Sequence, residues 1–316
     1  MDIDQYDYIF VDECQDLNMA QQTILQKMMK EKSRFIAVGD AQQAIYGFTG
    51  SDIESFDRLT QLPNTKQLPL SVCYRCSKAV VRHAQKINPI IQPYEHNIEG
   101  AVRMDGKIDD IESGDFVLCR NTSPLVELYF KLLSNGQKAF IKGRDIGENL
   151  TMIIEPYLGH ESLTTLEFLG EELKKLKEEL KAKGISKPEF NEKYISLREK
   201  VDVLSVFLKK FSTTESVVKH IRTIFKEEGS GIVLSTIHKS KGLEADRVHI
   251  IRYDLIPSQY ATQPWQKVQE RNLEYVMITR AKKELIYIPN EEWLDISKLQ
   301  ELGDLDELQR LVTEKL

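Results

Sequence analysis

Long apolar runs are missing from this chain of 316 residues, and no stretch approaches the roughly 20 apolar residues that a membrane-spanning helix needs. The first residues, MDIDQYDY, are acidic and lack the apolar core of a signal peptide. An excess of basic residues is also missing, because 43 Lys and Arg face 49 Asp and Glu, a net charge of −6. This balance excludes a polybasic nucleic-acid coat but permits a local basic groove. We therefore predict a cytoplasmic protein with no membrane partner.

Cysteine is scarce, with four residues at Cys14, Cys73, Cys76 and Cys119. Cys73 and Cys76 form the C-x-x-C of the stretch CYRC. A zinc site would need two further ligands, and the sequence has no second C-x-x-C and no H-x₃-H to supply them. The scarcity favours four reduced thiols, and a metal or redox role for the C-x-x-C is the less favoured alternative.

Apolar residues make up 41% and charged residues 29% of the chain, an ordinary globular mixture long enough for two domains. Short apolar runs alternate with helical patterns, which is typical of an α/β fold with parallel sheets. Strands are predicted at 8–11, 34–39, 66–72, 115–120, 139–142, 231–236, 247–251 and 284–288. Helices are predicted at 19–31, 77–88, 123–135, 214–226 and 266–283.

The segment 161–211 has a different pattern. Leucines recur with 3-4 spacing from Leu166 to Leu180, and apolar residues recur again from Phe190 to Leu208, with Lys and Glu on the other faces. The stretch AKGISKP separates the two repeats. This pattern predicts an antiparallel helical hairpin with a leucine-lined seam. The alternative is two amphipathic helices packed on the main body.

Polar residues follow three of the predicted strands directly. Asp12 and Glu13 follow the first, GDAQQ follows the second, and STIHKSKGLE follows the strand at 231–236. Ligands of open parallel sheets bind beyond the carboxyl ends of the strands. An acid pair in this position suits nucleotide hydrolysis, where one carboxylate holds Mg²⁺ and the other orients a water molecule.

Five blocks of this chain resemble successive motifs of the UvrD/Rep/PcrA-like superfamily 1 DNA helicases, and they occur in the family's order. The blocks are VDECQD, VGDAQQAIYGFTG, CYRCS, STIHKSKGLEADRV and QERNLEYVMITRAKKEL. The resemblance covers roughly residues 7–150 and 212–290. It implies RecA-like parallel sheets flanked by helices, with ATP and Mg²⁺ as cofactors and single-stranded DNA or DNA junctions as partners.

The resemblance also implies a role for particular residues, although each residue taken alone would fit an ordinary structural role. Catalytic roles are implied for Glu13, Gln43, Arg75 and Arg280. Nucleotide binding is implied for Asp12, Tyr74 and Glu244, with Asp12 also holding the metal. DNA binding is implied for Tyr46, Phe48, Thr236 and His238. The sequence departs from the family at Cys73, where Asn is common.

Another departure is the absence of a G-x-x-x-x-G-K-[ST] phosphate loop before Asp12. We therefore expect a C-terminal portion of a helicase that is inactive as an isolated chain. The expected domains are the end of a first RecA-like domain (1–62), a complete second one in two parts (63–150 and 212–316), and a helical insertion (151–211).

Three functions are compatible with these patterns. The leading one is the C-terminal portion of an ATP-dependent 3′–5′ DNA helicase, with DNA repair as an expected context. The second is a non-catalytic RecA-like remnant that binds DNA or protein. The third, the motor of a helicase–nuclease, is disfavoured because no spaced acidic cluster with a lysine follows residue 290.

Overall fold

The structure is a computed structural model that describes residues 3–47 and 54–293. The chain divides into two compact units. Unit 1 comprises residues 1–100 and 256–282, and unit 2 comprises residues 101–255 and 283–316. Of the predicted site residues, Phe48 lies outside the described residues. The domain boundaries expected from the sequence remain predictions.

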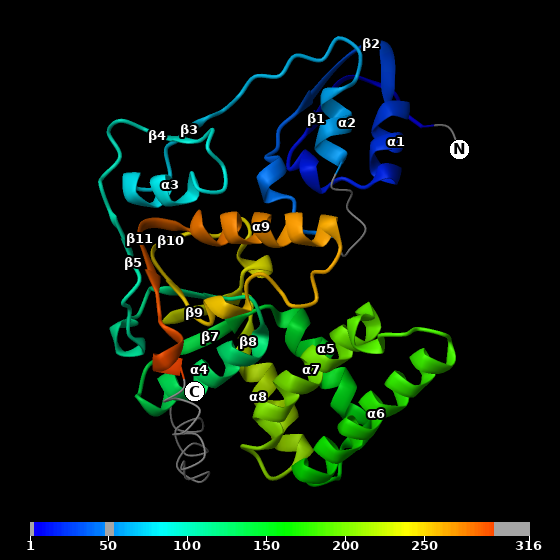
Figure 1. Ribbon diagram of the computed structural model, residues 1–316, viewed down its shortest axis with the longest axis vertical. Helices are drawn as coiled ribbons and strands as arrows, with labels where there is room; N and C mark the ends of the chain where they lie inside the picture. The colour runs from blue at the N-terminus through cyan, green and yellow to red at the C-terminus, as the bar shows by residue number, and fades with distance from the viewer. Residues whose placement is uncertain (1–2, 48–53, 294–316) are drawn as a thin grey trace. The chain divides into compact units, whose positions relative to one another are not determined.

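Unit 1 begins with the parallel strands β1 (Tyr6–Val11) and β2 (Met29–Ala37), joined through helix α1 (Met19–Lys27). Helix α1 begins at Asn18, whose side chain accepts a hydrogen bond from the Gln21 backbone, while the Gln21 side chain accepts one from the Asn18 backbone. This reciprocal cap satisfies two backbone N–H groups that the first helical turn would leave unpaired. Because β1 and β2 pair in parallel, the carboxyl ends of the two strands lie side by side (Figure 1).

The rest of unit 1 is mostly helical. Its remaining elements are α2 (Ser55–Thr60), β3 (Val72–Cys73), α3 (Lys78–Ala84), β4 (Gln92–Pro93) and α9 (Pro264–Ile278). Proline at the start of α9 suits the first helical turn, which needs no N–H donor there. Strands β3 and β4 form a short parallel pair.

Unit 2 is built on a seven-stranded sheet in the order β5–β11–β10–β6–β9–β7–β8. Its strands are β5 (Ala101–Arg103), β6 (Phe116–Cys119), β7 (Ala139–Lys142), β8 (Phe225–Lys226), β9 (Ile232–Thr236), β10 (Ala245–Ile250) and β11 (Ala281–Tyr287). The pairs β5–β11, β10–β6, β6–β9, β9–β7 and β7–β8 are parallel. Parallel strands need helical crossovers, which accounts for the expected α/β alternation. The RecA-like fold class predicted from the sequence is confirmed.

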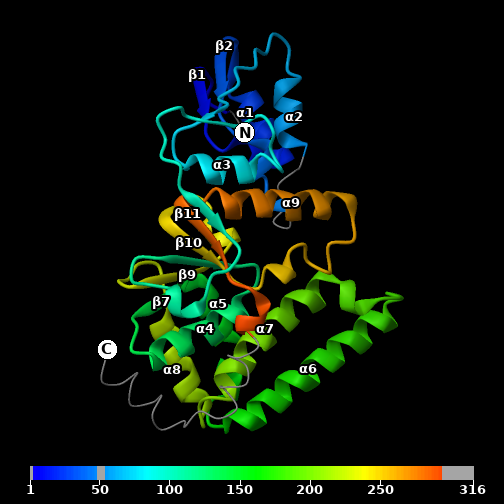
Figure 2. The same ribbon diagram turned by 60° about the vertical axis from the view of Figure 1, so that its left-hand side comes forward.

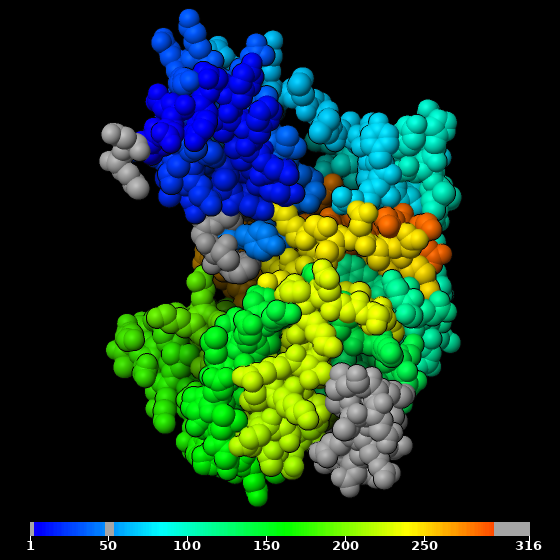
Figure 3. All heavy atoms as spheres, turned by 180° about the vertical axis from the view of Figure 1, so that it is seen from behind, coloured from blue at the N-terminus to red at the C-terminus, as the bar shows by residue number. Residues whose placement is uncertain are grey.

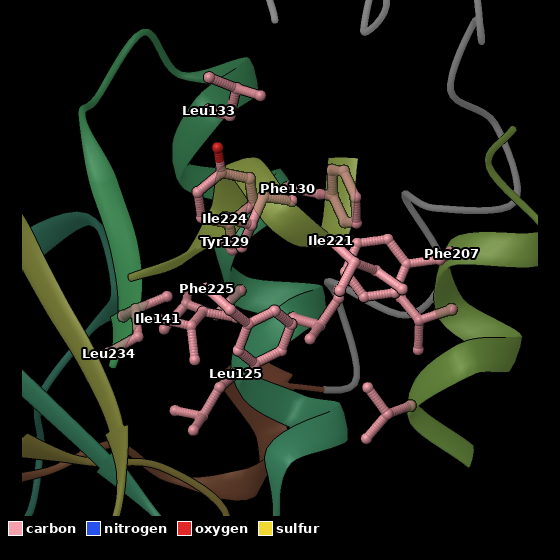
Figure 4. Packing of buried hydrophobic residues seen from close by; sticks show 14 of the residues in the cluster. Leu125, Tyr129, Phe130, Leu133, Ile141, Phe207, Ile221, Ile224, Phe225 and Leu234 are labelled. Atoms are coloured by element: carbon pink, nitrogen blue, oxygen red, sulfur yellow. The ribbon is translucent and has the colours of Figure 1, made fainter. Parts of the chain in front are cut away.

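The helices of unit 2 are α4 (Thr122–Ser134), α5 (Arg144–Ile154), α6 (Ser162–Ala182), α7 (Glu192–Leu208) and α8 (Thr214–Ile224). Side chains of α4, α7 and α8 share one hydrophobic cluster with strands β7 to β9 (Figure 4). Phe130 of α4 contacts Phe207 of α7 edge to face, with ring centroids 5.6 Å apart. The green and yellow-green helical segments are packed side by side in the space-filling view (Figure 3).

The segment 161–211 contains two helices, as its apolar repeats predict. Helices α6 and α7 are in contact (Figure 2), and the backbone N–H of Ser162 donates to the carbonyl of Ser212 at 3.0 Å. The start of α6 therefore meets the end of α7, so the pair is antiparallel. Helix α7 also packs on α4, because Val203 and Phe207 are buried in addition to the predicted seam. Helix α7 therefore agrees with both predicted alternatives, because it pairs with α6 in a hairpin and also packs on the body of unit 2.

The structure corrects several predicted boundaries. The segment 66–72 is not a strand except at Val72, because Leu68 and Leu70 are 84% and 87% exposed and gain no burial from pairing. Residues 29–31 belong to β2 rather than to a helix, since Met29 pairs with Tyr6 of β1.

Strand pairing also ends two other predicted helices early. Helix α9 ends at Ile278, because residues from Ala281 join the sheet of unit 2, and α8 ends at Ile224, because Phe225 pairs with Ile141. Helix α3 ends at Ala84 rather than at residue 88. Among the described residues, no helix is long and apolar enough to cross a membrane.

Candidate functional site

The acid pair lies directly beyond strand β1. The backbone of Val38 donates to the Val11 carbonyl at 2.8 Å, so β1 and β2 stay paired up to the point where Asp12 begins. Both acids are exposed, and the backbone N–H of Glu13 donates to Oδ1 of Asp12 at 2.9 Å. Glu13 has a φ of 49°, a left-handed conformation that is uncommon outside glycine. Such strain is concentrated at functional sites.

Gln15 holds the Glu13 carboxylate in place. Its side chain is 1% exposed, and its Nε2 donates to Oε2 of Glu13 at 2.6 Å. Its Oε1 accepts from the backbone N–H of Asp40 at 3.1 Å. Gln15 thereby connects the end of β1 to the end of β2, and its own amide has little rotational freedom.

The connection continues to Gln43. Oδ2 of Asp40 accepts from Nε2 of Gln43 at 3.1 Å, and Oδ1 of Asp40 accepts from the Gln42 backbone at 2.9 Å. Glu13, Gln15, Asp40 and Gln43 thus form one hydrogen-bonded chain, which we call the polar relay. Gly39 is required beside it, because a Cβ there would lie 2.5 Å from Oε1 of Gln15.

Helix α9 supports the far end of the polar relay. Nδ2 of Asn272 donates to the carbonyls of Ala41 and Ala44 at 3.1 and 3.0 Å. One turn later lies Tyr275, whose hydroxyl accepts from Asn88 at 3.3 Å. Burial raises the pKa of Tyr275, and the nearby charge of Asp40 raises it further. Tyr275 therefore lies near the relay as a neutral phenol.

Tyr74 and Arg75 lie on the turn 73–76, which is fastened at both ends. Nδ2 of Asn97 donates to the carbonyls of Cys73 and Cys76 at 2.9 and 2.8 Å. Tyr74 is 69% exposed, and its ring lies against Tyr94 with centroids 4.7 Å apart. Arg75 is also exposed. The turn presents an aromatic face and a guanidinium to solvent, a suitable arrangement for a purine base and a phosphate.

Arg280 is in a different environment, since it is only 1% exposed. Its Nε donates to the carbonyl of Val276 at 2.9 Å, and its Nη2 donates to Oγ1 of Thr279 at 3.2 Å. These contacts satisfy acceptors in the last turn of α9. Arg280 therefore has a structural role in addition to any role toward a ligand.

Tyr46 is half-buried near the acid pair. Burial raises the pKa of its phenol, and the charges of Asp16 and Glu13 raise it further. Tyr46 therefore stays neutral and can act as a hydrogen-bond donor.

Three predicted residues belong to unit 2. Thr236 ends β9, and its Oγ1 accepts from the backbone N–H of Lys239 at 3.3 Å. Burial lowers the pKa of His238 to about 3, with a further contribution from the charge of Arg120, so its imidazole is neutral at pH 7. Glu244 is exposed directly before β10.

Of the predicted residues that the structure describes, seven lie in unit 1, and the polar relay joins two of them, Glu13 and Gln43, through Gln15 and Asp40. Sequence reasoning did not assign roles to Gln15, Asp40, Asn97 or Asn272. Gln15 and Asp40 carry a usable signal, because both lie within a few residues of a strand end. Asn97 and Asn272 carry none, because their partners are distant in the chain.

The exposed carboxylates of Asp12 and Glu13 are oxygen ligands of the kind that Mg²⁺ binds. Among the described residues, no group of three or more His, Cys, Asp or Glu could hold a metal alone. Only one oxygen of Asp12, Oδ1, accepts a hydrogen bond within the described chain. Mg²⁺ at phosphate sites is usually held by one or two carboxylates, water and the phosphates themselves. The donor set at Asp12 and Glu13 agrees with that pattern.

Two family profiles match the chain. The UvrD/REP helicase N-terminal domain matches residues 3–64, and the UvrD-like helicase C-terminal domain matches residues 160–292. These segments contain the acid pair, Gln43, Arg280 and the strand-end residues of unit 2.

Similar proteins include three named as helicases. The chain is 25% identical to the F-box DNA helicase protein 1 of Schizosaccharomyces pombe, with 89% of this chain and 34% of that protein covered. It is 23% identical to the putative ATP-dependent DNA helicase YjcD of Bacillus subtilis, with 89% and 51% covered. It is 34% identical to the ATP-dependent DNA helicase PcrA of Staphylococcus aureus over 86 residues, with 26% and 12% covered. The chain spans about half or less of the length of these relatives.

Proposed function

The chain belongs to the UvrD-like superfamily 1 DNA helicases, and on that basis we propose that it forms part of an ATP-dependent motor that moves 3′ to 5′ along single-stranded DNA. The observation that carries this proposal is the polar relay, which connects an acid pair beyond β1 to Gln43 beyond β2. Phosphoryl transfer depends mainly on positioning and charge neutralisation. A network that orients a carboxylate and an amide supports that chemistry.

Each residue of the relay has a proposed role. Asp12 is the residue that would hold Mg²⁺, which supplies positive charge for the phosphates when it is bound. Glu13 then accepts a proton from the attacking water, and Gln15 keeps its carboxylate pointed at that water. Gln43 donates a hydrogen bond to the γ-phosphate, with its amide oriented by Asp40.

The turn 73–76 has the proposed role of binding the nucleotide. Tyr74 stacks on the adenine, supported by Tyr94 behind it. Arg75 is exposed and can bond two phosphate oxygens with its planar fork. Arg280 is proposed to reach the same phosphate by exchanging one of its present hydrogen bonds, and Glu244 is proposed to bind the ribose.

The DNA contacts are proposed for Tyr46, Phe48, Thr236 and His238. Because the His238 imidazole is neutral, it would contact the strand by hydrogen bonding rather than by charge. Aromatic rings such as Tyr46 bind single strands without sequence preference, since every base has a π-face. We also propose that the protein acts on DNA junctions and takes part in DNA repair.

The test is the substitution Glu13→Gln in the full-length protein. Loss of the general base should lower the DNA-stimulated kcat for ATP about 10²–10⁴-fold, with little change in the affinity for a fluorescent ATP analogue. Glu31→Gln is the matched control, because Glu31 is exposed near the start of β2, at the opposite end of the strand from Asp40. A Glu13→Gln enzyme with the wild-type kcat would contradict the proposed catalytic role.

A second candidate is a non-catalytic module that binds DNA or protein. The two candidates differ in ATP turnover by residues 1–316 with single-stranded DNA present. Robust turnover would remove the non-catalytic candidate, whereas absent turnover with retained DNA binding would favour it for this chain alone.

A further inference from the structure

A short segment after strand β2 lies against one face of helix α9. Nδ2 of Asn272 donates to the carbonyls of Ala41 and Ala44 at 3.1 and 3.0 Å. Three residues earlier on the helix lies Gln269, and a Cβ added at Gly47 would come within 1.8 Å of its Nε2. Positions three apart are neighbours on a helix surface. The segment therefore follows the helix from Ala41 to Gly47.

The same segment carries two residues with proposed roles at different ligands. Gln43 belongs to the polar relay, where its Nε2 donates to Asp40, and Tyr46 lies a few residues further along the chain. Between them, Ala44 and Ile45 are 6% and 1% exposed. A buried connection of this kind has little freedom to deform, because protein interiors are close-packed. A shift at Tyr46 can therefore reach Gln43.

Asn272 fixes this segment to the helix with a single amide. Its side chain is buried, and the two hydrogen bonds use both N–H donors that an asparagine amide has. The backbone N–H of Ala44 also donates to the Ala41 carbonyl, at 3.3 Å, which closes the turn that the amide spans. The Asn272 amide therefore determines where this turn lies relative to α9.

Helix α9 is itself held by the segment 76–88. Nη2 of Arg271 donates to the carbonyl of Ile87 at 3.3 Å, and the sulfur of Cys76 donates to the carbonyl of Thr279 at 3.6 Å. These contacts join the helix to the chain that follows the turn 73–76. The helix is therefore a fixed support against which the turn after β2 is positioned.

We propose that Asn272 is a positioning residue that couples DNA binding at Tyr46 to the γ-phosphate contact of Gln43, by holding the turn between them against α9. This role rests on the proposed function, because that function supplies both ligands. Asn272 itself contacts neither DNA nor nucleotide. Coupling acts in both directions, so DNA changes the affinity for nucleotide by the same factor as nucleotide changes the affinity for DNA.

The first measurement tests the contact of Asn272 with the turn and does not require ATP turnover. Hydrogen exchange of the peptide that contains residues 41–46 should become about tenfold faster or more in Asn272→Ala, because the turn loses the two hydrogen bonds that fix it to α9. Peptides from β1 should exchange as in wild type. Unchanged exchange at residues 41–46 in the variant would overturn the assignment.

The second measurement determines the coupling in the full-length protein. The affinity for a fluorescent single-stranded oligonucleotide is measured with and without a non-hydrolysable ATP analogue, and the affinity for the analogue with and without the oligonucleotide. Coupled ligands typically change each other's affinity by about 5–150-fold. In Asn272→Ala both factors should fall to about one, while each ligand alone binds as in wild type. A general loss of folded protein would lower the amount of binding and leave the factors unchanged.

Two further variants separate the hydrogen bonds of Asn272 from the shape of its side chain. Asn272→Asp keeps the shape but replaces the N–H donors with acceptors, so it should lose the coupling as Asn272→Ala does. Lys267→Ala changes an exposed position on the same helix and should keep the coupling. Coupling at the wild-type level in Asn272→Asp would show that the two hydrogen bonds do not carry it.

The outcomes distinguish this role of Asn272 from the proposed function. If wild type shows coupling and Asn272→Ala keeps it, the role of Asn272 fails and the proposed function stands. If neither ligand affects the other in wild type, the proposed motor fails, and the coupling role of Asn272 fails with it.

Discussion

At the scale of single residues, the geometry of the acid pair depends on Gln15. The nitrogen of the Gln15 amide contacts Glu13, and its oxygen contacts the backbone of Asp40. The position of the Glu13 carboxylate therefore depends on the distance between the ends of β1 and β2. Gln15 is a positioning residue, because every role proposed for it acts through Glu13.

Replacing Gln15 should therefore slow the proposed chemistry. Gln15→Ala removes the amide N–H that donates to the Glu13 carboxylate, and we expect kcat for ATP to fall about 10–100-fold, as for other supporting residues of metal sites. The kcat of the Gln15→Glu variant should fall at least as far, because the substitution places a second negative charge beside Glu13. The measurement is the DNA-stimulated ATPase of the full-length protein, with KM determined separately.

The control for this prediction is Gln26→Ala, since Gln26 is exposed on α1. A change in KM with an unchanged kcat would show that Gln15 acts on binding rather than on the orientation of Glu13.

The two candidate arginines should respond differently to substitution. Arg75→Ala removes an exposed side chain and should leave the melting temperature unchanged, whereas Arg280→Ala removes hydrogen bonds to Val276 and Thr279 and should destabilise the fold by about 1–3 kcal/mol. Both should lower kcat by about 10³-fold or more if both reach the γ-phosphate.

Urea unfolding and ATPase assays on the same preparations separate the two effects. Arg75→Lys extends the test, because a point charge cannot make the two-pronged contact and should not restore the rate. A well-folded Arg75→Ala enzyme with near-normal kcat would exclude Arg75 from the site.

At the scale of elements, the helical hairpin depends on where α6 stops. The helix ends after Ala182, and Gly184 follows with a φ of 81°, so the chain turns back toward α7 in a conformation that favours glycine. Gly170 lies inside the same helix, where a Cβ would meet no atom within 4 Å. The same substitution at these two glycines should therefore have opposite effects.

Gly184→Ala should destabilise unit 2 by about 1–2 kcal/mol, because a Cβ is strained in the left-handed region. Gly170→Ala should stabilise it by up to about 1 kcal/mol, since alanine is the better helix former. The measurement is the change in free energy of unfolding by urea. Equal effects of the two substitutions would contradict the turn geometry.

At the scale of the whole molecule, the stability of unit 2 should depend on pH through Asp115. Its carboxylate accepts from Nε2 of the fully buried His249 at 2.9 Å, which ties the start of β6 to β10. Burial by itself would raise the pKa of Asp115. Hydrogen bonds from His249 and the Glu112 backbone, with the charges of His249 and Arg247, hold the pKa below its ordinary value.

A lowered folded-state pKa sets the sign of the effect. The carboxylate stabilises the fold above about pH 4, and this stability is lost as the pH falls through the folded-state pKa. Asp115→Asn should therefore be about 1–3 kcal/mol less stable than wild type at pH 7, and the difference should shrink below pH 4. Urea unfolding at several pH values measures it.

The control is Asp109→Asn, because Asp109 is exposed. A difference between Asp115→Asn and wild type that is the same at pH 7 and pH 3 would show that ionisation of Asp115 does not contribute.

The sequence alone determined the features that local pattern encodes. Strand 139–142 was predicted with its observed bounds, and the helix over 123–135 was predicted within one residue, because a short apolar run and a glycine stop act within a few residues. The α/β class followed from the alternation of such segments, and the family followed from motifs that lie close to strand ends.

Only the tertiary structure decided which residues complete the site. Asn272 binds the carbonyl of Ala41 from 231 residues away, and Asn97 binds the carbonyl of Cys73 from 24 residues away. The ends of α1 at Lys27 and of α9 at Ile278 were likewise set by strand pairing and not by local propensity. The physical reason is that a hydrogen bond or buried contact stabilises a conformation only when both partners are present, and a one-dimensional pattern contains one partner at a time.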